Sequence, residues 1–89
     1  MKYAVYELQW DEGNEEHIWK HRVNAWEVED VVFDDPERKA SLVWSSRHGE
    51  SLIIKGRTRS GRPLIVSLKP IDPKAGVWRC ATAMETKGR

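Results

Sequence analysis

The sequence predicts an α+β fold in which two N-terminal helices pack on one face of a four- to five-stranded antiparallel sheet. Three observations lead to this expectation. Apolar residues recur with helical spacing over residues 25–32, apolar and polar residues alternate over much of residues 41–82, and short turns join the alternating segments. Because 89 residues suffice for one compact domain, we expect residues 1–89 to form a single unit.

The first strand and first helix are expected before residue 22. Tyr6, Leu8 and Trp10 alternate with polar residues, which is typical of a strand, and a turn signal follows at residues 11–14. Asn14 is the expected cap of a helix over residues 15–21. Acidic residues begin this segment and basic residues end it, as the helix dipole favours.

The second helix is expected to begin after Asn24. Asn24 and Glu27 have the spacing of a capping box, and the apolar residues that follow share one helical face: Ala25, Val28, Val31 and Val32. Pro36 pushes the residue before it out of the helical region, so the helix should end at Asp35.

Strands are then expected over residues 41–45, 50–57, 63–69 and 77–82. Alternate side chains of a strand point to opposite faces. The even-numbered residues are the more apolar and should pack on the helices: Leu52, Ile54, Leu64, Val66, Leu68, Trp78 and Cys80. The odd-numbered residues should face away: Ile53, Lys55, Arg57, Ile65, Ser67, Lys69, Val77, Arg79 and Ala81.

Charge is distributed unevenly along the chain. The net charge is +1, but residues 1–35 carry −7 and residues 36–89 carry +8. Five cations lie between residues 51 and 69 without a carboxylate, and Arg59 and Arg62 flank the expected hairpin. Lysine and arginine also line ordinary solvated sheet faces. A face that combines cations, isoleucines and no acidic residue nevertheless favours a platform for phosphate groups.

Several classes of protein are disfavoured. A single cysteine, Cys80, excludes an intramolecular disulfide, and the sequence has neither a signal peptide nor an apolar run long enough to span a bilayer, so we expect a cytoplasmic protein without a membrane partner. His17 and His21 have a spacing that can serve a metal, but no third ligand is evident. We therefore expect no metal and no cofactor, and interpret His21 as a group for proton transfer.

Six segments, taken in order, resemble the BrnT family of toxins. They are Trp10-Asp11-Glu12-Gly13-Asn14, Lys20-His21-Arg22-Val23, Trp26 to Asp34, Ile53 to Thr58, Gly61-Arg62 and Trp78 to Ala83. Together they extend over nearly the whole chain. The chain departs from the family at Met84, where members usually have an arginine.

The resemblance implies a RelE-like fold and the toxin of a type II toxin–antitoxin system, a ribonuclease that cleaves RNA without a metal and inhibits translation. It also implies a BrnA-like ribbon-helix-helix antitoxin, with operator DNA bound only through the antitoxin complex. For this chemistry we expect His21 to transfer protons and Arg57 and Arg79 to hold the phosphate. Lys20, Lys55, Arg62 and Lys69 are expected to position the RNA backbone.

Two other functions are weighed against this one. A degenerate homologue that binds RNA or the antitoxin without cleaving RNA is the main alternative, because Met84 replaces the family's arginine. A DNA-binding regulator would suit the basic strands. However, Glu27, Glu29 and Asp30 make the second helix acidic, so no recognition helix is available.

Overall fold

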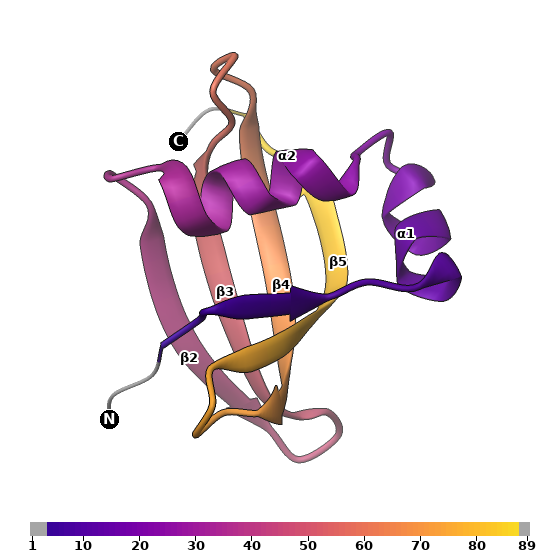
Figure 1. Cartoon of the computed structure of the whole chain (residues 1–89), viewed down its shortest axis with the longest axis vertical. Helices are drawn as coiled ribbons and strands as arrows, with labels where there is room; N and C mark the ends of the chain where they lie inside the picture. The colour runs from indigo at the N-terminus through magenta and orange to yellow at the C-terminus, as the bar shows by residue number, and fades with distance from the viewer. Residues whose placement is uncertain (1–3, 88–89) are drawn as a thin grey trace.

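The structure, a computed structural model that describes residues 4–87, is an α+β fold with a five-stranded mixed sheet (Figure 1). The sheet has the strand order β1-β5-β4-β3-β2. The elements are β1 (Glu7–Gln9), α1 (Glu12–Trp19), α2 (Ala25–Glu29), the π-helical segment η1 (Asp30–Asp34), β2 (Lys39–Ser45), β3 (Gly49–Arg57), β4 (Pro63–Asp72) and β5 (Val77–Glu85). The α+β prediction is confirmed. No helix within the described part of the chain is long and apolar enough to cross a membrane.

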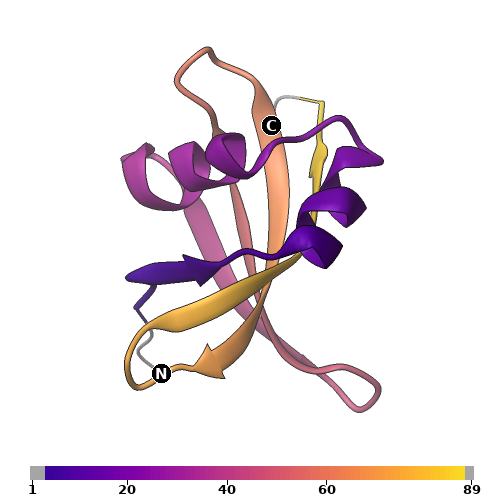
Figure 2. The ribbon, with the colours of Figure 1, turned by 45° about the vertical axis from the view of Figure 1, so that its right-hand side comes forward.

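The first strand corrects the prediction of a purely antiparallel sheet. β1 runs parallel to β5, with Leu8 opposite Trp78, whereas β2, β3, β4 and β5 are antiparallel to their neighbours. Figure 2 shows β1 alongside the beginning of β5. The two strands lie about as far apart in sequence as the chain allows, so no local turn could reveal this pairing.

Helix α1 begins three residues earlier than expected. Asp11, not Asn14, is its cap: Asp11 Oδ1 accepts from the Asn14 backbone N–H at 2.9 Å, and Asn14 Oδ1 accepts from the Asp11 N–H at 2.8 Å. The buried Asn14 side chain also donates to the carbonyls of Gln9 at 3.0 Å and Cys80 at 3.4 Å. Asn14 therefore ties α1 to the middle of β5.

The second helix begins where predicted. The Asn24 N–H donates to Glu27 Oε1 at 3.0 Å, and η1 continues the helix to Asp34, just before Pro36. Figures 1 and 2 show α2 and η1 lying across the sheet and α1 lying beside β5. Val28, Val31 and Val32 are buried, as their spacing predicts.

The core confirms the predicted alternation in the last three strands up to Cys80. All seven even-numbered apolar residues expected inside are buried. The alternation ends at Ala81, because Leu68 pairs with Cys80 while Ser67 pairs with Thr82, so that Ala81 is the extra residue of a β-bulge. After this bulge the odd-numbered Ala83 is buried, and Met84 lies opposite Ile65.

Candidate nucleic-acid interface

The sheet has an open face on the side opposite α2 and η1. We define it by the odd-numbered residues over 39–43 of β2, 51–57 of β3 and 63–69 of β4, together with three residues of β5. None of the following members is buried: Lys39, Ser41, Val43, Ser51, Ile53, Lys55, Arg57, Pro63, Ile65, Ser67, Lys69, Arg79, Thr82 and Met84. The odd-numbered residues of β2, β3 and β4 include four cations and no carboxylate. The face is therefore accessible and positively charged.

One end of this face carries a pair of lysines. Lys39 and Lys55 are direct cross-strand partners, and both are exposed. Neither side chain makes an ion pair or a hydrogen bond within residues 4–87. Because like charges placed opposite each other destabilise a sheet, an anion bound between them would relieve the repulsion.

A hollow of 440 Å³ adjoins the lysine pair. Its lining consists of Asp35, Glu37, Lys39, Lys55, Gly56, Arg57, Pro63, Leu64 and Thr86. Arg57 donates from Nη1 to the carbonyl of Gly61 at 3.0 Å and from its backbone N–H to Asp35 Oδ2 at 2.8 Å. Asp35 Oδ1 also accepts from the Glu37 N–H at 2.9 Å, so both carboxylate oxygens are held by the backbone.

The other end of the open face carries Lys69 and Arg79, which are also cross-strand partners. Both are already engaged. Lys69 Nζ donates to Ser51 Oγ at 2.7 Å and to the carbonyl of His48 at 2.9 Å. Arg79 binds both carboxylate oxygens of Asp11, with 3.2 Å between Arg79 Nη2 and Oδ1, and the hydrogen bond from Arg79 lowers the pKa of Asp11 to about 2.

The two ends are too far apart to hold one phosphate. Arg57 lies opposite Pro63 and Arg79 lies opposite Lys69, six residues further along β4, which is about 20 Å at the rise of a strand. The expectation that Arg57 and Arg79 act as two donors to the same phosphate is therefore corrected. Lys55 belongs to the end with Arg57, and Lys69 to the end with Arg79.

Arg62 is a second correction, because its side chain holds the fold rather than facing the open side. It donates to Glu27 at 2.9 and 3.0 Å, to Glu85 at 2.9 Å and to the carbonyl of Arg22 at 2.8 Å. Burial opposes its charge, but the hydrogen bonds to Glu85 and Glu27 outweigh it and raise the pKa of Arg62. The rim residue Arg59 is likewise paired, with Asp34 at 3.0 Å and Asp30 at 3.8 Å.

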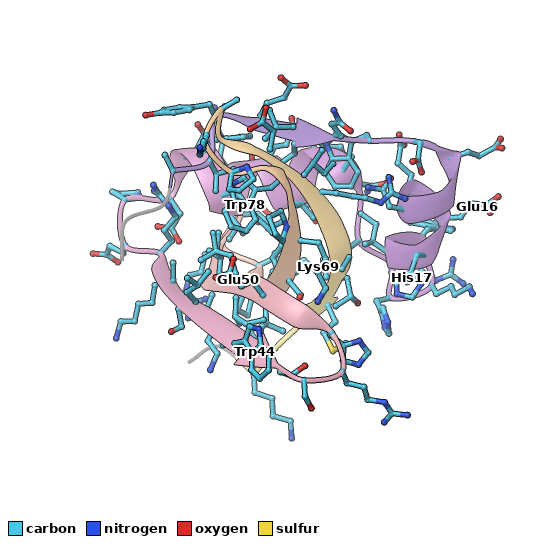
Figure 3. All side chains as sticks on the ribbon, turned by 90° about the horizontal axis from the view of Figure 1, so that it is seen from below. Glu16, His17, Trp44, Glu50, Lys69 and Trp78 are labelled. Carbon is cyan, nitrogen blue, oxygen red and sulfur yellow. The ribbon has the colours of Figure 1, made fainter. Side chains whose placement is uncertain are left out.

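His21 and Lys20 lie just after the last residue of α1, and both are exposed. The His21 ring makes an edge-on contact with the ring of His17, with 6.4 Å between centroids. A Cβ at Gly13 would lie 3.9 Å from Arg79 Nη2, so this side of α1 faces Arg79. His17 lies one helical turn after Gly13, on the same side of the helix. Figure 3 shows Lys69 projecting on the side of α1 and His17, with Trp78 on the other side of the strands.

Two residues of the candidate interface are not predicted by the sequence, Lys39 on the open face and His17 on α1. Lys39 lies outside the expected strand. The alternation of Lys39 and Ser41 with Ala40 and Leu42 would extend the strand pattern to include it. For His17 the sequence leaves open a metal ligand or a histidine that makes local contacts near the end of its helix. Within residues 4–87, no group of three or more His, Cys, Asp or Glu side chains lies close enough to hold a metal ion.

Compared with protein-family models, curated proteins and solved structures, the chain has no match. Its chemistry is therefore inferred from its own side chains. The cations can bind phosphate, and the imidazoles of His17 and His21 can accept or donate a proton. Cys80 is no nucleophile, because burial raises the pKa of its thiol to about 12.

Proposed function

We propose that this chain is the toxin of a type II toxin–antitoxin system, a metal-independent ribonuclease of the BrnT type with a RelE-like fold. The observation that carries the proposal is the open sheet face, where Lys39, Lys55, Lys69 and Arg79 surround Ile53 and Ile65 and the odd-numbered residues of β2, β3 and β4 include no carboxylate. Such a face binds the phosphate backbone electrostatically and leaves apolar surface for bases and sugars.

The two ends of the face take different roles in this proposal. Lys39, Lys55 and Arg57 bind backbone phosphates around the hollow and fix the position of the RNA. The scissile phosphate lies at the other end, where Arg79 stabilises the charge that develops on its oxygens. To do so Arg79 exchanges its carboxylate partner, Asp11, for the phosphate, since one guanidinium cannot serve both with the same donors.

Cleavage then needs only proton transfer. A 2′-hydroxyl loses its proton to the imidazole of His21 and attacks the adjacent phosphorus, while the bond to the 5′-oxygen breaks and that oxygen takes a proton from water. The imidazolium then returns its proton to the solvent. The products are a 2′,3′-cyclic phosphate and a free 5′-hydroxyl. His21 is the assigned proton-transfer residue, and His17, whose ring contacts it, is its nearest substitute.

The test separates RNA binding from RNA cleavage. Purified protein is incubated with total RNA in the presence of EDTA, and the fragments and the bound RNA are measured separately. His21→Ala and Arg79→Ala should abolish cleavage with RNA still bound, whereas Lys55→Ala should weaken binding. Lys74→Ala removes an exposed cation from the β4–β5 turn and serves as the matched control. Cleavage that EDTA stops, or that both His21→Ala and Arg79→Ala retain, refutes the scheme.

A second candidate function is RNA or antitoxin binding without cleavage. The position of Met84 favours it: Met84 lies opposite Ile65, which is also the partner of Lys55, so the side chain that replaces the family's arginine belongs to the open face. Met84→Arg distinguishes the two functions. If the natural chain binds RNA without cutting it and Met84→Arg restores cutting, the chain is a degenerate member. Met84→Leu is the control for the loss of methionine.

The partners belong to the same proposal. The toxin binds RNA directly and binds a BrnA-like antitoxin, which alone contacts operator DNA. The acidic first 35 residues, with a charge of −7, would attract a basic segment of such an antitoxin rather than RNA.

A further inference from the structure

The strand β2 is an edge of the sheet that is open to another strand. It pairs with β3 at every position from Lys39 to Ser45 without a bulge, and no strand within residues 4–87 pairs with its other side. Natural sheets protect such edges with proline, bulges or charges. β2 has no proline, and its one charged residue, Lys39, lies at its end. The middle of β2 is therefore free to pair with a strand of another molecule.

An exposed tryptophan and a hollow lie on the same side of this strand. Ala40, Leu42 and Trp44 alternate toward the helices; Ala40 and Leu42 pack against the core, but Trp44 is 69% exposed. Beside Ala40 is a hollow of 370 Å³ lined by Ala4, Val5, Val32, Pro36, Arg38, Ala40 and Ile54. Figure 3 shows Trp44 and its cross-strand neighbour Glu50 well away from α1.

The spacing of these features is self-complementary. Leu42 lies midway between Ala40 and Trp44, so two copies of β2 paired antiparallel about a twofold axis at Leu42 place Trp44 of each copy opposite Ala40 of the other. Val43, which is 44% exposed, then faces Ser41, and Lys39 faces Ser45, so that no like charges meet. Residues directly opposite have Cβ atoms only about 5 Å apart, which brings each indole to the hollow beside Ala40.

We propose that β2 is a homodimer interface, where a second copy of this chain adds its own β2 and the two five-stranded sheets become continuous. Trp44 of each copy fills the hollow of the other, lying against Val5, Val32 and Ile54, and Arg38 in the lining supplies a cation to the indole face. The contact is isologous, with the same patch used twice. It does not depend on the proposed ribonuclease activity.

Sedimentation equilibrium of the full chain over a wide range of concentrations tests the dimer. We expect a reversible monomer–dimer equilibrium, and Trp44→Lys should raise its dissociation constant by about 100-fold or more, because each dimer contains this tryptophan contact twice. Trp26→Lys is the matched control: Trp26 is 58% exposed but lies on α2, so its replacement should leave the dissociation constant unchanged. A wild-type chain that stays monomeric, or a dimer that Trp44→Lys leaves intact, overturns the proposal.

Covalent trapping tests the register without relying on Trp44. In the double variant Ser41→Cys, Val43→Cys, the thiol at position 41 of one copy lies opposite the thiol at position 43 of the other copy. Mild oxidation should therefore give a covalent dimer. Cys80 is fully buried and does not interfere. Adding Trp44→Lys to this variant should suppress the trapping. A dimer that forms without such cross-links has another interface, which also overturns the proposal.

Discussion

The two ends of the open sheet face carry similar cations in opposite states. At one end the side chains of Lys39 and Lys55 face each other with no partner in residues 4–87, whereas at the other end Lys69 is held by Ser51 and His48 and Arg79 by Asp11. The difference teaches that the position of a cation on a strand does not establish whether its side chain can bind a phosphate. The lysine pair can bind an anion directly, but Arg79 must first release the carboxylate of Asp11.

The largest loss of stability should come from replacing Arg62, whose side chain donates to Glu27, Glu85 and the carbonyl of Arg22. Arg62→Ala leaves the carboxylate of Glu27, whose side chain is only 8% exposed, without its cationic partner. We expect the free energy of unfolding to fall by about 3 kcal/mol. Urea denaturation measures it, with Lys55→Ala as the control, which should stay within about 0.5 kcal/mol of wild type. Equal losses for the two variants would contradict the distinction between engaged and available cations.

Gly56 should give the next largest effect. A Cβ at this position would lie 2.6 Å from Asp35 Oδ2 and 3.0 Å from Val31 Cγ1, so Gly56→Ala must displace the loop that lines the hollow by the lysine pair. We expect a loss of about 2 kcal/mol in the free energy of unfolding. Ser67→Ala, elsewhere on the open face, should be nearly neutral. An unchanged unfolding midpoint for Gly56→Ala would show that the loop does not need this close approach.

Asp11→Asn should make Arg79 more available to bind a phosphate, because it removes the carboxylate that Arg79 binds. Asparagine retains the capping of α1, but the neutral amide no longer offsets the charge of Arg79. RNA affinity at low salt should rise by about fivefold, and the plot of log affinity against log salt should steepen by about 1, as expected for one more phosphate contact. Glu50→Gln changes the net charge equally on the helix-facing side of β3. An equal gain from that variant would attribute the effect to net charge alone.

The smallest effect is a pH dependence of stability. The pKa of Asp11 is lowered from 3.8 to about 2, mainly by the hydrogen bond from Arg79. A carboxylate with a lowered pKa in the folded state adds stability that is complete above its unfolded pKa and is lost as the pH falls through the folded pKa. Thermal unfolding should therefore show a contribution that fades between pH 3.8 and about pH 2. Asp11→Asn should lack that contribution; an identical profile for both proteins would contradict it.

The sequence was sufficient for what depends on local pattern. The alternation of β3 and β4 correctly separated Leu64, Val66 and Leu68 from Ile65 and Lys69, because every strand side chain follows the same two-residue period. The cap at Asn24 was found for a similar reason, since the spacing to Glu27 lies within one helical turn.

What the sequence could not provide depends on contacts between distant segments. The bulge at Ala81 leaves no mark in the pattern, yet it reverses the faces of Ala83 and Met84. The partners of Arg62 and Arg79 are 35 and 68 residues away, at Glu27 and Asp11, so their engagement could not be read from the basic stretch itself. Asp11 and Asn14 are both good caps, and only the contacts of Asn14 with β5 decide between them.

The unequal outer strands of the sheet limit how it can grow. β1 has three residues and β2 has seven, so once two molecules have joined through β2, each end of the combined sheet is a strand too short to recruit another. Assembly by this route stops at a closed pair and does not continue into a fibre.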